Sequence, residues 1–159
     1  MAAKDTPSMA KNKIRRSLAA ILDPHPSAKA VDDLWKYFNA TCAYCGVLID
    51  RKSRTGHVDH LVSSALGGSN DIHNHVLSCA RCNGDEKREE AWQSFLSRKA
   101  NDPVVAKERT DRILAWLAKA KPATASVSSE ERAQAIVQSA IDSYDLAVAQ
   151  MRALKKGGT

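Results

Sequence analysis

Two Cys-x-x-Cys pairs, Cys42/Cys45 and Cys79/Cys82, constrain this chain more than any other feature, and they contain all four of its cysteines. Two thiolates separated by two residues can bind one metal ion from a tight turn, and two such pairs supply the four soft ligands that zinc prefers. Four thiolates complete the zinc coordination shell and leave no open position. The sequence therefore predicts one structural zinc site that joins the segment around residue 42 to the segment around residue 80.

Length and composition favour a small helical protein. The chain has 159 residues, enough for one compact domain with appendages, and its side chains are 43% apolar but only 5% aromatic. We expect modest packing and a central module that depends on its metal for folding. No apolar run approaches the roughly 20 residues that span a bilayer, and no secretory signal is recognisable. Cysteines at zinc spacing favour a reducing compartment, so we expect a cytoplasmic protein without a membrane partner.

The net charge of +6 is unevenly distributed along the chain. Residues 1–30 and 91–128 each carry a net charge of +4, whereas residues 31–90 carry −2. A slightly acidic centre between basic flanks suits a polyanion that lies across the molecule while central carboxylates hold a metal. Ordinary solvated helix faces explain the same distribution.

The hydrophobic pattern divides the chain into five segments. Helical spacing of apolar residues predicts an N-terminal helical segment over 1–40, an accessory helix over 101–121 and a C-terminal helix over 129–159, with a linker at 122–128. Residues 41–100 form the module with the cysteines. Helical periodicity disappears between Thr41 and about Ser78, where a β-hairpin with a long loop through Gly67-Gly68 is predicted, and it returns from Cys79 through Leu96.

The last helix carries a short heptad seam. Apolar residues follow a 4-3-4-3 spacing at Val137, Ile141, Tyr144, Val148 and Met151. Two interpretations remain open: the seam packs on the body of its own chain, or it pairs with a second copy in a homodimer.

Between and just after the cysteines stand residues with the chemistry of phosphodiester hydrolysis: Asp59, His60, Asn74 and Asn83. Such a reaction needs a base that deprotonates water, and histidine suits that task near neutral pH. It also needs a hard cation, held by oxygen ligands, that neutralises the charge of the departing oxygen. A plain zinc knuckle would not require an Asp-His pair followed by two asparagines.

Residues 41–90 resemble the HNH nuclease family, of ββα-metal fold and zinc-ribbon type. The resemblance rests on Cys42-Ala-Tyr-Cys45, His57-Val-Asp59-His60, Gly67-Gly68, Asn74 through Cys79, and Cys82-Asn83 with Lys87 beyond. It implies an α+β, mostly helical protein in which a small zinc-clamped ββα-metal module is flanked by N- and C-terminal helices. It also implies that His60 is the general base, that Asp59 and Asn83 bind a catalytic magnesium or manganese ion, and that Asn74 orients His60 or pins the loop.

The sequence departs from the family pattern at two places. Ser63-Ser64 stands where many relatives have a proline, and Lys87 stands where the histidine-rich branch has a metal-binding histidine. His57, His73 and His75 are interpreted as peripheral, structural or phosphate-facing residues. These departures affect the metal coordination and not the class of reaction.

Basic residues flank the predicted site and are candidates for nucleic-acid binding: Arg51, Lys52 and Arg54 at a hairpin tip, and Arg81, Lys87 and Arg88 on the following helix.

The sequence thus predicts a metal-dependent endonuclease that hydrolyses DNA. One alternative is a non-catalytic zinc module that binds nucleic acid or a protein. Another is an interaction protein assembled through its last helix. Residues 91–159 carry no motif that identifies a function.

Overall fold

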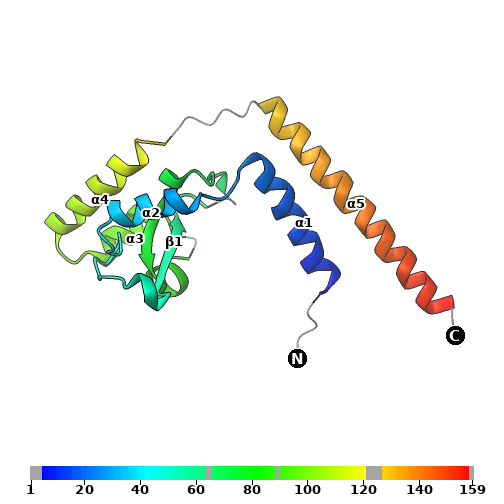
Figure 1. Cartoon of the computed structure of the whole chain (residues 1–159), viewed down its shortest axis with the longest axis horizontal. Coiled ribbons are helices and arrows are strands. Elements are labelled where there is room, and N and C mark those ends of the chain that lie inside the picture. Colours follow the sequence, from blue (N-terminus) through cyan, green and yellow to red (C-terminus); the bar gives the residue numbers. More distant parts are fainter. Residues whose placement is uncertain (1–4, 64–65, 89, 121–126, 158–159) are drawn as a thin grey trace. The chain divides into compact units, whose positions relative to one another are not determined.

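The computed structural model describes residues 5–63, 66–88, 90–120 and 127–157 (Figure 1). By packing, the chain divides into a central unit, residues 25–122, and a two-helix unit, residues 1–24 with 123–159. The predicted α+β, mostly helical class is confirmed, because helices dominate and a single two-stranded antiparallel sheet is found among the described residues. Among these residues, no helix has the length and apolar character that crossing a bilayer requires.

The central unit begins with α2 (Ala28–Tyr37), which Ser27 caps by accepting a hydrogen bond from the backbone N–H of Ala30. A short 3₁₀ turn, η1 (Arg51–Ser53), precedes β1 (Gly56–His60). A second turn, η3 (Ile72–Asn74), precedes β2 (His75–Cys79). The chain then forms η4 (Arg81–Lys87), α3 (Trp92–Lys99) and α4 (Pro103–Leu117). Asp102 caps α4 by accepting a hydrogen bond from the backbone N–H of Val104, and proline stands at the first helical position.

The two strands form the predicted hairpin. β1 pairs antiparallel with β2 in a register that sets Gly56 opposite Cys79, Asp59 opposite Val76 and His60 opposite His75. Successive side chains of a strand point to opposite faces, so Asp59 and His60 lie on different faces of this ribbon. The loop between the strands ends at Asn74, whereas Asn83 follows β2 in η4.

A two-stranded ribbon cannot support itself, and the helices complete its core. The fully buried side chains come from the cysteine turn, the sheet and all three helices: Leu34, Phe38, Tyr44, Leu77, Phe95 and Ile113. Residues 101–117, for which the sequence gives no function, therefore contribute directly to the core of the module that carries the cysteines.

The helical segment after Cys79 differs from the single continuous helix that we predicted. η4 is a π-helix, and it ends where Arg88 adopts a positive φ of 47° before α3 begins at Trp92. Cys82 and Lys87, five residues apart, are both buried in η4. Such π-turns are rare and are frequent at functional sites.

The two-helix unit consists of α1 (Pro7–Leu22) and α5 (Val127–Gly157), which pack against each other. An ion pair joins Lys11 to Asp145 at 2.9 Å. Part of the predicted seam, Val137, Ile141, Tyr144 and Val148, is buried or half-buried, which accords with packing inside the chain. α1 and α2, predicted as one N-terminal segment, belong to different packing units. Of the linker predicted at 122–128, residues 122–126 lie outside the described residues, and residues 127 and 128 belong to α5.

Candidate metal and catalytic site

The four cysteines converge on one point. Their sulfur atoms all lie within 4.8 Å of one another, and the Sγ atoms of Cys45 and Cys79 are 3.8 Å apart. Four thiolates at about 2.3 Å from a tetrahedral zinc ion are separated from one another by about 3.8 Å. The cluster therefore fits a structural metal ion in size, donor type and number.

Tight backbone turns and helix α4 hold this cluster in place. The turn after Cys42 closes through the N–H of Gly46, which donates to the Cys42 carbonyl at 2.8 Å with Gly46 at a φ of +75°. The Arg109 guanidinium of α4 lies against this glycine and donates to the Tyr44 carbonyl at 2.7 Å. A Cβ at Gly46 would lie 2.3 Å from the Arg109 Nη2 atom and would displace that side chain, and the φ of +75° also favours glycine here.

The thiols of the cluster differ in acidity. Burial raises the pKa of Cys42, but hydrogen bonds from the backbone N–H groups of Cys45, Cys79 and Tyr44 outweigh it, and the pKa falls below its ordinary value. Burial and the neighbouring Cys42 raise the pKa of Cys45 to about 11. Four adjacent thiolates need a cation to coexist, which is what a divalent metal supplies.

Asp59 lies on the face of β1 that packs toward the cysteine turn and η4, and only 8% of its surface is exposed. The Tyr44 hydroxyl donates to Asp59 Oδ2 at 2.8 Å. The Lys87 Nζ lies 3.2 Å from the same oxygen and 3.4 Å from Oδ1. Burial and the charge of Asp59 raise the pKa of the Tyr44 phenol well above its ordinary value, so Tyr44 stays protonated and remains a donor.

Lys87 requires a correction of its predicted role. It was expected among the residues that contact nucleic acid, but it is 6% exposed and its ammonium also donates to the His60 carbonyl at 3.0 Å. The π-turn of η4 directs its side chain inward, where it neutralises Asp59. In this position Lys87 is an internal cation of the site and does not face a phosphate.

His60, the last residue of β1, occupies the opposite face. Its Nε2 atom lies 3.1 Å from the Asn70 amide oxygen, and its ring packs at 3.9 Å, centroid to centroid, against the ring of His75. Because the Asn70 oxygen only accepts, Nε2 carries the proton in this pair and Nδ1 carries the lone pair of the neutral ring. His75 is itself fixed, because its Nδ1 atom lies 2.8 Å from the Asp71 carbonyl.

Asn74 pins the loop between the strands. Its amide nitrogen donates to the carbonyls of Val62 at 2.9 Å and Ser69 at 2.8 Å, and its oxygen accepts from the Val62 N–H at 3.1 Å. Gly68 lies inside this clamp, where a Cβ would be 1.8 Å from the Val62 oxygen. Of the two roles predicted for Asn74, these contacts match the pinning of the loop, and the atom that meets the His60 ring belongs to Asn70.

Asn83 lies in the first turn of η4, next to Cys82, and is half-buried. Among the described residues its side chain makes no hydrogen bond, which leaves its amide oxygen available to a ligand. Asp59 and Asn83 together offer the hard oxygen donors that magnesium and manganese prefer, so the donor set fits such an ion. The Lys87 ammonium, however, already lies on the Asp59 carboxylate.

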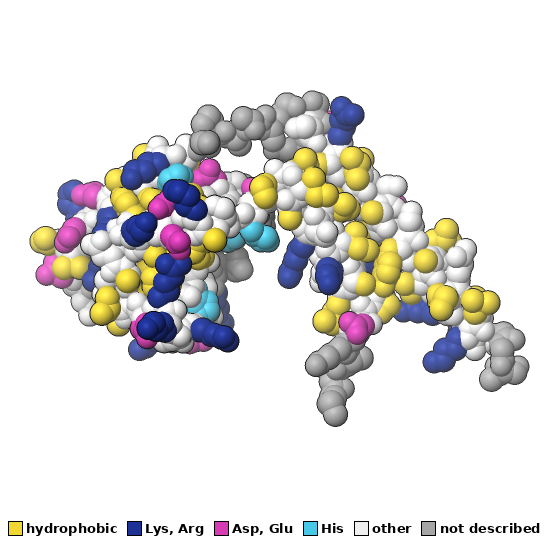
Figure 2. All heavy atoms as spheres, viewed as in Figure 1, with side chains coloured by type: hydrophobic (Ala, Val, Ile, Leu, Met, Phe, Trp, Pro, Cys, Tyr) yellow, Lys and Arg dark blue, Asp and Glu magenta, His cyan; other side chains and the backbone are white. Residues whose placement is uncertain are grey.

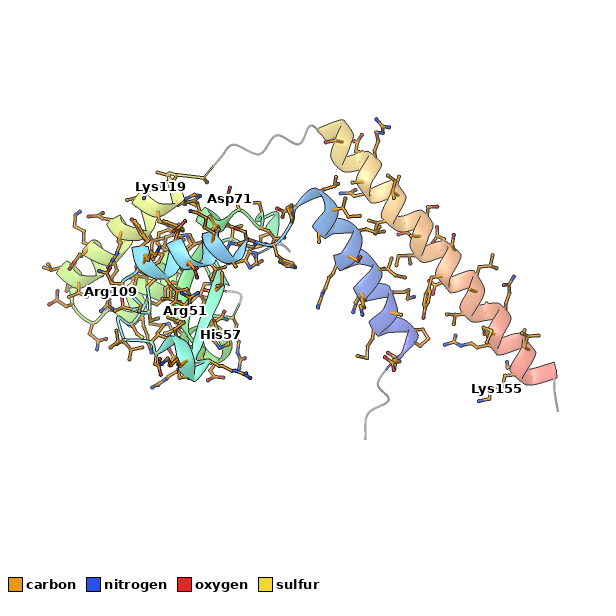
Figure 3. The ribbon with its side chains drawn as sticks, viewed as in Figure 1. Arg51, His57, Asp71, Arg109, Lys119 and Lys155 are labelled. Carbon is orange, nitrogen blue, oxygen red and sulfur yellow. The ribbon has the colours of Figure 1, made fainter. Side chains whose placement is uncertain are left out.

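The basic residues predicted at a hairpin tip lie instead in and just after the turn η1, before β1. The hairpin begins only at Gly56, after these three residues. Arg51, labelled in Figure 3, pairs with Asp32 of α2, and its guanidinium lies over the Trp35 ring at 5.4 Å from the ring centroid. Lys52 and Arg54 are exposed. Arg81 is exposed and pairs with Glu86 at 2.6 Å, and Arg88 is exposed at the end of η4.

Two residues of the site, Tyr44 and Asn70, were not singled out from the sequence. His75 was interpreted as a structural or phosphate-facing residue, but its contact with the His60 ring was not predicted. Tyr44 lies inside the first cysteine pair, and only the fold brings it to Asp59. His75 follows Asn74, and pairing in register with His60 could have identified it. Asn70 lies in a loop whose course the sequence pattern does not specify.

Comparison with known proteins agrees with this geometry. Residues 42–89 match the family model described as HNH endonuclease, which confirms the resemblance seen in the sequence. The chain is also 27% identical over 124 residues to the "SPbeta prophage-derived putative HNH endonuclease YoqL" of Bacillus subtilis (strain 168). That alignment covers 67% of this chain and 50% of the relative, so the chain spans about half the length of the protein it matches.

Proposed function

Starting from an HNH endonuclease match over residues 42–89, we propose that this protein is a metal-dependent endonuclease that hydrolyses phosphodiester bonds of DNA. The observation that carries the proposal is the pair Asp59 and His60 at the end of β1, beside the four-cysteine cluster and on opposite faces of the strand. A structural zinc ion in the cluster would fix the cysteine turn and η4 around the strand.

His60 is the general base in this proposal. Asn70 fixes the ring at Nε2, and His75 supports its face, so Nδ1 is the atom that takes a proton from water. The water oxygen attacks phosphorus, the bond from phosphorus to the leaving oxygen breaks, and that oxygen acquires a proton from solvent. Holding the ring in a single orientation favours this step because no rotation is required when substrate arrives.

Asp59 and Asn83 would hold the catalytic magnesium or manganese ion. When bound, the ion supplies positive charge next to the phosphate and the leaving oxygen. Tyr44 and Lys87 fix the Asp59 carboxylate from the buried side. Lys52, Arg54 and Arg88 are exposed cations suited to phosphate contacts, whereas Arg51 and Arg81 would have to exchange Asp32 and Glu86 for a phosphate.

Cleavage of supercoiled plasmid tests the proposal. The purified protein with one zinc per chain is incubated with magnesium, with manganese or with EDTA, alongside His60→Ala and the control His57→Ala, a neighbouring histidine on the other face of β1. We expect metal-dependent nicking or linearisation that falls at least a hundredfold in His60→Ala and persists in His57→Ala. Cleavage that survives His60→Ala at equal zinc content would refute the assigned base.

A second candidate function is a zinc module that binds nucleic acid without cutting it. The observation that favours it is the Lys87 ammonium on Asp59, since a carboxylate that is neutralised internally has less need of a metal ion. This alternative predicts DNA binding that is indifferent to magnesium and to His60→Ala, with no cleavage of any plasmid form.

A further inference from the structure

The two-helix unit leaves most of its apolar surface uncovered. Among its described side chains only Ile141 is buried, with 3% of its surface exposed. α5 has 31 residues and is about 46 Å long, whereas α1 has 16 residues and spans about 24 Å. One short helix therefore covers only part of a long one, and a pair of helices has no core of its own.

The apolar arc of α5 is also too wide for one partner. Val137, Ile141, Tyr144 and Val148 form one row that is buried or half-buried, and we assign this row to the contact with α1. Directly beside them runs a second row at helical spacing, which we call the outer stripe: Ala133, Ile136, Ala140, Ala147, Met151 and Leu154. Ala133 and Ala140, in this second row, are half-buried as well. Ile136, Met151 and Leu154 are 63%, 68% and 71% exposed, and Figure 2 shows apolar side chains gathered over this unit.

The spacing of the outer stripe is self-complementary. Its positions are symmetric about residues 143 and 144, so an antiparallel copy of α5 sets Ala133 opposite Leu154, Ile136 opposite Met151 and Ala140 opposite Ala147. At each end of the stripe the small Ala133 of one copy meets the large Leu154 of the other. At the centre Ala140 and Ala147 are both small, which permits close approach of the two helices. A groove between Pro7 of α1 and the C-terminal half of α5 lies at the border of the two rows; α5 lines it with Tyr144, Ala147, Val148, Met151, Arg152 and Lys155.

The charge of α5 is complementary in the same orientation. Residues 127–142 carry three acidic residues and one basic residue, whereas residues 143–157 carry one acidic and three basic residues, including Lys155 at the C-terminal end (Figure 3). Antiparallel pairing sets the negative half of one helix against the positive half of the other and also opposes the helix dipoles. A parallel pair would bring like charges together.

We propose that the outer stripe of α5 binds the outer stripe of a second copy of this chain, antiparallel and about a two-fold axis near Ser143 and Tyr144. The isologous contact completes a bundle of two α1 and two α5 helices, which buries the apolar arc on both sides. The surface is independent of the nuclease proposal, since none of its residues belongs to the central unit.

Light scattering coupled to size exclusion tests the association on the full-length, zinc-loaded protein. We expect twice the chain mass of 17.3 kDa at micromolar concentration. The double variant Ile136→Glu/Met151→Glu should be a monomer with unchanged helix content. The control Leu146→Glu, 62% exposed on another face of α5, should remain a dimer. A monomeric wild type would overturn the proposal, even if that monomer bound lipid vesicles or DNA through the outer stripe. A stripe variant that stays dimeric would overturn it as well.

Crosslinking tests the register. In an antiparallel pair, a mixture of Ala140→Cys and Ala147→Cys chains forms a mixed disulfide, whereas either variant alone does not. In a parallel pair, each variant alone crosslinks and the mixture gives no preferred heterodimer. Zinc should keep the four native cysteines from forming disulfides. The wild-type chain, which has only these cysteines, is the control and should not crosslink. Crosslinking of the single variants would refute the antiparallel arrangement while leaving the nuclease proposal untouched.

Discussion

Individual residues at the site divide into those that hold a carboxylate and those that hold an imidazole. Tyr44 and Lys87 converge on Asp59, while Asn70 and His75 converge on His60. The two sets lie on opposite faces of one strand. Tyr44 can therefore be altered without touching the partners of His60, whereas Lys87 also donates to the His60 carbonyl and contacts both residues.

The first prediction concerns Tyr44→Phe, which removes one donor to Asp59 without changing the packed ring. Loss of a buried hydrogen bond to a charged group should lower the free energy of unfolding by about 1.5–3 kcal/mol, measured by urea denaturation. Tyr37→Phe is the control, since its hydroxyl donates to the Arg112 carbonyl at 2.8 Å, far from the carboxylate. Both variants should lose stability, but only Tyr44→Phe should lower the rate of plasmid cleavage. Equal rates would show that Tyr44 serves stability alone.

A second prediction concerns Lys87→Met. Removal of this ammonium leaves Asp59 buried without its cation, and loss of one partner of such a pair costs roughly 3–5 kcal/mol. A divalent ion at Asp59 would restore the missing charge. Manganese should therefore raise the melting temperature of Lys87→Met more than that of the wild type, as measured by thermal denaturation with and without the ion. The double variant Asp59→Asn/Lys87→Met should show no such rise. An equal response in all three proteins would place the metal elsewhere.

Among the elements, the turn η1 and the π-helix η4 determine which cations face solvent. η1 exposes Lys52 and Arg54 but lets Arg51 pair with Asp32. η4 turns Lys87 inward and leaves Arg88 outside. In the sequence these basic residues are equivalent candidates for phosphate contacts. Their positive charge alone does not indicate which of them already pair with an acidic side chain of the protein.

A third prediction separates these cations. Lys52→Ala and Arg54→Ala should each weaken binding of duplex DNA and lower the slope of log affinity against log salt by about 1, because each removes one phosphate contact. Arg51→Ala should have a smaller effect, since Asp32 already neutralises that charge. Fluorescence anisotropy with labelled DNA in magnesium-free buffer at several salt concentrations measures all three. A larger loss for Arg51→Ala would contradict the assignment.

The whole molecule joins a central unit with a complete core to a pair of helices without one. Every residue of the main hydrophobic cluster lies between Leu34 and Leu117, in the central unit. The cysteine cluster, Asp59 and His60 also lie within it. We therefore expect folding of this unit to need the metal and helices α2, α3 and α4, and not to need α1 or α5.

A fourth prediction follows for a fragment of residues 25–122. It should bind one zinc ion per chain, unfold cooperatively and lose its near-ultraviolet circular dichroism when the metal is chelated, because the cluster closes the fold around β1 and β2. A matched fragment of residues 25–100, which lacks Ile113 and Trp116 of α4, should not fold cooperatively. Failure of 25–122 to fold with zinc present would mean that α1 or α5 contributes to the core.

The sequence by itself determined the cysteine cluster and the approximate order of elements, and it indicated which residues to propose for catalysis. Spacing is sufficient for a metal cluster, because Cys-x-x-Cys turns bind metal locally, and alternation along a strand is sufficient to separate Asp59 from His60. The tertiary structure alone decided which partners these groups meet. Tyr44, Asn70 and the inward-turned Lys87 reach the site through loop paths and a π-turn, and such long-range contacts leave no periodic pattern in a sequence.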